Sequence, residues 1–115
     1  MSLTIWHNPR CSKSRETLGL IEAAGKTPRI IAYLKDPPSA AEALALAGRL
    51  GLPIREMLRK GETAFKEHNL ANPALSDAEI AEVVAGHPIL IERPIVESAK
   101  GSRICRPPER VREIL

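Results

Sequence analysis

The sequence predicts an α/β fold with a mixed four-stranded sheet, and three observations carry that prediction. The chain opens with a strand, a helix and a second strand within residues 3–34. A block of helical segments follows, and two strands with a final helix close the chain. The first three elements suit a right-handed parallel crossover, and the two later strands suit a hairpin.

The N-terminal elements follow from the spacing of apolar residues. Leu3–Trp6 is a short apolar run of the kind expected for a buried strand. Ser12–Ala24 carries apolar residues at helical spacing, and Gly25 is a stop signal for that helix. The next segment, Arg29–Leu34, contains β-branched residues and is predicted to be the second strand.

Two capping boxes mark helices in the middle of the chain. Ser39–Glu42 and Ser76–Glu79 each place a serine at the cap and a glutamate three residues later. The helices that they open are expected to end near Gly51 and Gly86, since glycine favours helix termination. Two shorter helical segments are expected between them: Ile54–Arg59 and Thr63–His68.

The C-terminal part reads as a hairpin followed by a helix. The apolar segment His87–Ser98 contains Pro94, which belongs at a strand start or edge because proline cannot donate to a ladder. Ala99–Gly101 is a tight turn, and Ser102–Arg106 is expected to pair back as a strand. The prolines at 107–108 then start a final helix.

This order, β-α-β … β-β-α, is that of a thioredoxin-like fold with a helical insertion at about residues 39–86. A chain of 115 residues suits one domain, 1–115, with one modest core. Hydrophobic residues make up 43% and charged residues 27%, which is typical of a folded soluble protein. Because only 3% of the residues are aromatic, the core must consist of Leu, Ile, Val and Ala.

The charge pattern excludes several classes of partner. A net charge of +3 without a long basic run does not indicate nucleic-acid binding, and one Trp, one Tyr and one Phe leave little to stack on bases. No apolar run is long enough to span a bilayer. The start of the chain shows no secretion signal, so we expect a cytoplasmic protein with reduced cysteines and no membrane partner. The sequence does not determine the oligomeric state, and our working expectation is a monomer.

Cys11 is the best candidate for chemistry, because it stands where a strand pattern gives way to a helical one. The first turn of a helix offers unpaired N–H groups and the positive end of the dipole, which favour a thiolate over a thiol. Lys13 and Arg15 lie within one turn and act in the same direction. The alternative, a small buried hydrophobe, fits this polar and basic neighbourhood less well.

Cys11 has no second cysteine close to it in the sequence. Ser14 stands where a Cys-x-x-Cys motif would have its second cysteine, so no local disulfide is possible and any second thiol must come from elsewhere. The other cysteine, Cys105, lies within a predicted strand, and we expect it to fill the core. His68 and His87 show no metal-ligand spacing with the cysteines, so no metal site is expected.

Arginines beside chain stops are candidates for binding an oxyanion. Arg59 ends a predicted helix, Arg93 precedes a proline, and Arg106 ends a predicted strand. A guanidinium group matches two oxygens at once, so three such groups around a thiolate would suit a doubly charged oxyanion. Taken singly, each arginine is better explained as a surface residue. His7, four residues before Cys11, is expected either to support the thiolate or to bond the loop backbone.

The segment His7-Asn8-Pro9-Arg10-Cys11-Ser12-Lys13-Ser14-Arg15 resembles the active-site loop of the glutaredoxin-dependent arsenate reductases. The other arsenate reductase type, related to low-molecular-weight phosphatases, has an Arg six positions after its Cys, where this chain has Thr17. The resemblance continues through four further segments in the same order: Tyr33–Pro38, Leu58–Lys60, His87–Ile95 and Arg103–Pro107.

The resemblance implies an oxidoreductase that reduces arsenate to arsenite, with Cys11 as the nucleophile. It implies that Arg59, Arg93 and Arg106 bind the oxyanion. It also implies that His7 and Ser14 adjust the reactivity of the thiolate without contacting the substrate. It also implies a cis Arg93–Pro94 bond, glutathione as a co-substrate in place of a bound cofactor, and glutaredoxin as a partner.

Three alternatives to arsenate reduction are considered, two of them from branches of the same family. One branch of the family comprises transcription regulators that sense redox state through a Cys-x-x-Cys pair, which Ser14 interrupts here. Another comprises small proteins thought to be glutathione-dependent thiol reductases, for which the same thiol and arginines would serve. A non-enzymatic redox-responsive binding protein is the third alternative.

Overall fold

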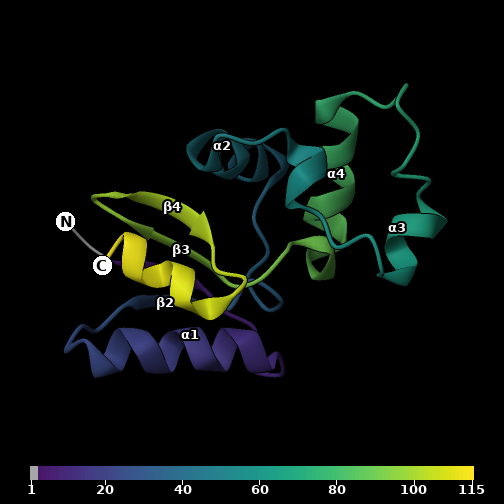
Figure 1. Cartoon of the computed structure of the whole chain (residues 1–115). Coiled ribbons are helices and arrows are strands. Elements are labelled where there is room, and N and C mark those ends of the chain that lie inside the picture. The colour runs from purple at the N-terminus through teal and green to yellow at the C-terminus, as the bar shows by residue number, and fades with distance from the viewer. Residues whose placement is uncertain (1–2) are drawn as a thin grey trace. The chain divides into compact units, whose positions relative to one another are not determined.

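The structure is a computed structural model, and it describes residues 3–115. These residues form two compact units. The first comprises the chain up to Asp36 together with Arg93–Leu115, and the second is Pro37–Glu92. Figure 1 shows that the first unit holds the sheet and that the second is built from helical segments. No helix within residues 3–115 is both long and apolar enough to cross a membrane.

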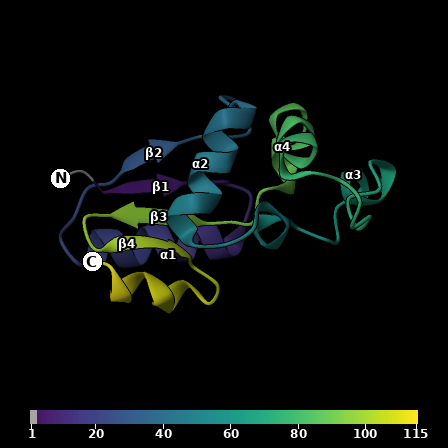
Figure 2. The ribbon, with the colours of Figure 1, turned by 90° about the horizontal axis from the view of Figure 1, so that it is seen from above.

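The sheet of the first unit has four strands: β1 (Thr4–Trp6), β2 (Arg29–Ile31), β3 (Ile95–Ser98) and β4 (Gly101–Ile104). Their order is β2-β1-β3-β4, as Figure 2 shows. β1 pairs with β2 in parallel, whereas the β1–β3 and β3–β4 pairs are antiparallel. This arrangement confirms the predicted mixed four-stranded sheet of a thioredoxin-like fold.

Two helices cover one face of this sheet: α1 (Ser12–Ala23) and the 3₁₀ helix η3 (Pro108–Glu113). Ile5 of β1 lies directly opposite Val96 of β3, so both side chains point to the same face. They pack there with side chains from both helices. The buried cluster consists of Ile5, Ile21, Val96, Cys105, Val111 and Ile114.

The final helix is a 3₁₀ helix, whereas an ordinary helix was predicted. Pro108, Val111 and Ile114 are its buried positions and stand three residues apart. A 3₁₀ helix has three residues per turn, so this spacing places all of them on one face. The apolar period of the segment therefore fits a 3₁₀ helix better than the 3.6-residue period of an α-helix.

The second strand is shorter than predicted. β2 ends at Ile31, and Ala32–Asp36 form a turn in which the Ala32 carbonyl accepts hydrogen bonds from the N–H groups of Lys35 and Asp36, both at 2.9 Å. β2 pairs only with the three residues of β1, and Ile31 lies opposite Trp6, the last of them. The apolar run from Ile30 to Leu34 extends further than the partner strand does.

The second unit contains the five remaining helical elements. α2 (Ala40–Leu50) and α4 (Asp77–Gly86) both begin with the predicted capping boxes, at Ser39 and Ser76. Replacing such a cap serine by alanine costs about 1 kcal/mol. The shorter elements are η1 (Ile54–Met57), α3 (Thr63–Glu67) and η2 (Pro88–Leu90). η1 ends before the predicted Arg59, because Leu58 turns into a bridge with Ile91.

The prolines of the C-terminal part lie where the sequence places them. Pro94 immediately precedes β3, and the hairpin turn joins β3 to β4. The Arg93–Pro94 peptide bond is cis, as the resemblance implies. The Arg106–Pro107 bond is also cis, which the sequence analysis did not anticipate.

Candidate active site

The sheet topology explains why segments far apart in the chain meet at Cys11. Trp6 at the end of β1 lies opposite Ile95 at the start of β3, and Ile95 also lies opposite Ile104 at the end of β4. Residues that follow β1, precede β3 and follow β4 therefore emerge at the same edge of the sheet. Cys11, Arg93 and Arg106 belong to these three segments.

Backbone N–H groups of the loop after β1 are fixed by hydrogen bonds to β2 and to Asn8. The N–H of His7 donates to the Ile31 carbonyl at 2.9 Å, which extends the β1–β2 pairing by one bond. Asn8 then folds the chain back, because its side-chain oxygen accepts from the Arg10 N–H at 2.9 Å and its carbonyl accepts from the Cys11 N–H at 3.0 Å. These bonds define the backbone position from which the thiol projects.

Cys11 occupies the N-cap position of α1 with an extended backbone (φ −91°, ψ 122°) and is partly exposed. The Cys11 side chain makes no capping hydrogen bond, because a neutral thiol is a weak acceptor. Partial burial raises the pKa of this thiol, but the backbone N–H of Ser14, the Arg93 side chain and the backbone N–H of Lys13 together lower it by more. The net effect is a pKa below the ordinary value, which favours the nucleophilic thiolate.

Arg93 is the cation that contacts the sulfur. Its guanidinium donates a hydrogen bond to Cys11 and also lowers the thiol pKa through its charge. Arg106 follows β4, and its Nη1 donates to the Arg93 carbonyl oxygen at 3.2 Å. The structure thus brings Arg93 to the Cys11 sulfur and Arg106 to the Arg93 backbone; that Arg106 binds the oxyanion stays a prediction.

His7 and Ser14 lie directly behind the thiol in a buried cluster with Asn8. The His7 Nδ1 and Ser14 Oγ atoms are 2.7 Å apart, and the Asn8 N–H donates to the same Oγ at 3.0 Å. Burial and, secondarily, the charge of Arg15 lower the pKa of His7, so its neutral form is favoured. The arrangement is consistent when the Ser14 hydroxyl donates to an unprotonated Nδ1 and accepts from Asn8.

Arg59 belongs to the second unit. Its N–H donates to the Leu90 carbonyl at 2.7 Å, and its guanidinium forms ion pairs with Glu62 and Glu92, each at 3.3 Å. These contacts fix its place within that unit. That Arg59 joins Arg93 and Arg106 in binding an oxyanion stays a prediction.

Cys105 is completely buried in the core of the first unit, as expected. Burial raises its pKa to about 12, so it remains a thiol at neutral pH. No group of three or more His, Cys, Asp or Glu residues placed to hold a metal ion occurs within residues 3–115.

Asn8 is the residue of this site that the sequence analysis passed over. It is 3% exposed, and it ties both the Arg10–Cys11 turn and the Ser14 hydroxyl to one backbone position. The Asn-Pro pair after a strand was the available signal, since asparagine before proline favours a turn.

Comparison with known proteins identifies the family of this chain. The model of the ArsC family matches residues 6–114. The chain belongs to the ArsC family. It is 46% identical over 115 residues to an arsenate reductase of Rhizobium meliloti (strain 1021), covering all of this chain and 82% of the relative. It is 47% identical to an arsenate reductase of Haemophilus influenzae, covering 100% of both chains.

Solved structures place this ArsC-family chain in the same fold. The structure of the arsenate reductase from Vibrio cholerae superimposes with a TM-score of 0.96 at 50% identity, covering 100% of this chain and 98% of that one. A more distant structure, the YFFB (PA3664) protein, is 13% identical with a TM-score of 0.79 and shares the fold alone. The thioredoxin-like architecture is thus shared by proteins of widely differing sequence.

Proposed function

We propose that this protein is an arsenate reductase that reduces arsenate to arsenite through a covalent adduct at Cys11. The proposal rests on the surroundings of the Cys11 thiol. This thiol lies at the N-terminus of α1, its pKa is lowered, and the Arg93 guanidinium donates a hydrogen bond to its sulfur. Membership of the ArsC family and the arsenate reductases among its relatives supply the identity of the oxyanion.

In the first step, the Cys11 thiolate attacks arsenic(V) and forms an S–As bond, and one arsenate oxygen leaves as water after protonation. Negative charge on the remaining oxygens is balanced by Arg93, which contacts the sulfur, and by Arg106, which is bonded to the Arg93 carbonyl. We assign the same task to Arg59. A guanidinium suits it because its donors match two oxygens at once.

In the second step, the thiolate of glutathione attacks the Cys11 sulfur. An S–S bond forms and the S–As bond breaks, so its electron pair stays on arsenic, which becomes arsenic(III) and leaves as arsenite. Each of the two sulfurs gives up one electron. A glutaredoxin thiol then attacks the mixed disulfide, takes over the glutathionyl group and releases the Cys11 thiolate. The scheme uses glutathione as a co-substrate and no bound cofactor.

We assign His7 and Ser14 to the support of the thiolate. Ser14 takes part with its backbone N–H, which faces the sulfur, and with its hydroxyl, which holds His7 and Asn8 behind the loop. Since Ser14 is not a cysteine and Cys105 is buried, neither supplies the second thiol that the reaction needs.

The test compares the two cysteines in an assay of arsenite formation with glutathione and glutaredoxin. Cys11→Ser should lower turnover to the background rate, since a serine hydroxyl stays protonated at neutral pH. Cys105→Ser is the matched control and should keep its activity, because the residue lies in the core and its Sγ already faces the Arg103 carbonyl oxygen at 3.7 Å. Full activity in Cys11→Ser would refute the proposal.

A second comparison tests the arginines. Arg59→Gln should lower kcat/KM for arsenate by roughly 10- to 100-fold, the equivalent of a charge-assisted hydrogen bond worth about 1.5–3 kcal/mol. Lys60→Gln removes the same charge from the neighbouring exposed side chain and should change kcat/KM little. Equal effects in the two variants would remove Arg59 from the site.

The thiol-reductase alternative is tested with the wild-type protein and Cys11→Ser. If the wild-type protein reduces glutathione mixed disulfides, Cys11→Ser does not, and neither forms arsenite, the protein is a thiol reductase and the arsenate proposal is wrong.

A further inference from the structure

A hollow of about 390 Å³ lies beside the Cys11 loop in the first unit. One wall is the loop His7–Arg10 after β1, and the other is formed by Ala32, Leu34 and Lys35 from the turn after β2. β1 and β2 run parallel, with Trp6 opposite Ile31, so the segments that follow them emerge at the same edge of the sheet. The volume falls within the range of about 300–1,000 Å³ that is usual for small-molecule sites.

The hollow combines an apolar surface with two positive charges. Leu34 contributes a large hydrophobic side chain that is 38% exposed. Arg10 and Lys35 are both exposed, and they stand on opposite walls. Within residues 3–115, neither side chain donates a hydrogen bond or forms an ion pair. Both cations are therefore available to a bound anion.

We propose that this hollow binds the thiol co-substrate, a small peptide thiol with a carboxylate at each end, as glutathione has. The inference rests on the proposed function, which requires an external thiol at the Cys11 sulfur. Arg10 and Cys11 are consecutive, so their Cα atoms lie about 3.8 Å apart, and the wall formed by His7–Arg10 leads directly into the residue that carries the reacting sulfur. Two carboxylates match two cations, and the central cysteine lies between them.

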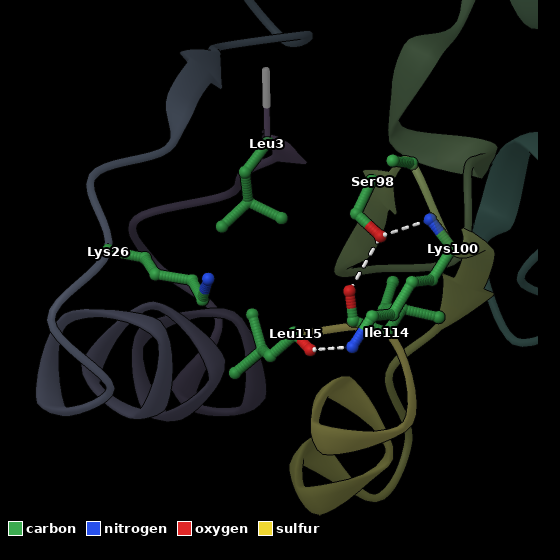
Figure 3. Close-up of a pocket in the computed structure, with 7 residues that line it drawn as sticks. Leu3, Lys26, Ser98, Lys100, Ile114 and Leu115 are labelled. Atoms are coloured by element: carbon green, nitrogen blue, oxygen red, sulfur yellow. Dashed lines mark hydrogen bonds between the residues drawn. The ribbon is translucent and has the colours of Figure 1, made fainter. Parts of the chain in front are cut away.

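A second hollow in the same unit serves as a comparison. It measures about 160 Å³ and is also flanked by two lysines, Lys26 and Lys100 (Figure 3). Lys100 already donates from its Nζ to the Leu115 carbonyl oxygen at 2.7 Å. Lys26 follows the C-terminal end of α1, and a helix of this length spans roughly 18 Å at 1.5 Å per residue. This hollow therefore lies far from Cys11.

The test uses thiol–disulfide exchange without arsenate. The Cys11 thiolate attacks one sulfur of an added disulfide, the S–S bond breaks, and the other half leaves as a thiolate, so that Cys11 carries a mixed disulfide. The rate is measured by mass spectrometry with glutathione disulfide and with hydroxyethyl disulfide, which carries no charge. The ratio of the two rates reports recognition of the peptide and cancels any change in the reactivity of Cys11.

Arg10→Gln and Lys35→Gln should each lower this ratio by about threefold, and the double variant by about tenfold, as expected for two exposed ion pairs. The double variant Lys26→Gln/Lys100→Gln removes the same charge elsewhere in the unit and should leave the ratio unchanged. Circular dichroism of each variant verifies that it is folded.

A ratio in Arg10→Gln/Lys35→Gln that equals the wild-type ratio would overturn the inference, as would an equal loss in the Lys26/Lys100 control. The outcome is independent of arsenate reduction. A protein that prefers glutathione disulfide through Arg10 and Lys35 but makes no arsenite would keep the co-substrate site and lose the proposed function.

Discussion

Replacing Ser14 by alanine removes a hydroxyl group that two groups of the Cys11 loop share. Ser14 is completely buried, and its Oγ lies 2.7 Å from His7 Nδ1 and 3.0 Å from the donating N–H of Asn8. Alanine fills nearly the same volume, so packing changes little. The main effect of Ser14→Ala is that the bonds to both partners are lost.

The size of the effect follows from the burial of those partners. Leaving a buried polar group without a partner costs about 1–3 kcal/mol. Asn8 is 3% and His7 is 9% exposed, so water has little access to Asn8 and somewhat more to the His7 ring. We therefore expect Ser14→Ala to lower the free energy of unfolding by about 2–4 kcal/mol, or the melting temperature by roughly 8–17 °C.

Urea unfolding at neutral pH measures this loss, and hydrogen exchange of the loop peptide locates it. The Asn8 amide donates to Ser14 and should exchange faster in the variant. Ser12→Ala is the matched control, because Ser12 lies in the same helical turn but is exposed. Its effect should stay within about 0.5 kcal/mol. A loss below about 1 kcal/mol in Ser14→Ala, or an equal loss in both variants, would refute the reasoning.

Three further predictions concern pH, thiol reactivity and the second unit. Burial lowers the pKa of His7, so as the pH falls through about 6.5 the unfolded chain binds a proton at this residue before the folded protein does. The free energy of unfolding, measured in urea, should therefore decrease below that pH, and the decrease should be shallower in His7→Gln. Equal slopes in the two proteins would contradict this. Because the pKa of Cys105 is raised to about 12, iodoacetamide near pH 8 should label only Cys11 in the folded protein and both cysteines in urea; native labelling of Cys105 would be the contrary result. Arg55→Met should lower the free energy of unfolding by about 1.5–3 kcal/mol and Lys60→Met by much less, because of the two side chains only Arg55 donates to backbone carbonyls. A similar loss in both variants would contradict this prediction. These carbonyls belong to Leu70, Asn72 and Leu75.

Elements set by neighbouring residues were predicted well. The capping boxes at Ser39 and Ser76, the start of α1 after Cys11 and the strand after Pro94 all appear where expected. Each depends on groups within one helical turn or on the missing N–H of a proline, so a short stretch of sequence contains the whole cause.

Predictions based on the length of a pattern were less accurate. The apolar run continues to Leu34, but β2 ends at Ile31 because β1 supplies no further partner. The C-terminal helix takes the 3₁₀ form because its buried residues must face the sheet at intervals of three. In both cases the decision rests with a partner element that local propensity does not describe.

By itself, the sequence determined that Cys11 stands at a helix start and that Ser14 leaves it a single thiol. Only the tertiary structure decided that Arg93 contacts the sulfur, that Arg106 donates to the Arg93 carbonyl, and that Arg10 and Lys35 line the same hollow. The physical reason is the strand register. It brings the ends of β1, β2 and β4 and the start of β3 to one edge of the sheet, and the spacing of residues along the chain carries no record of that meeting.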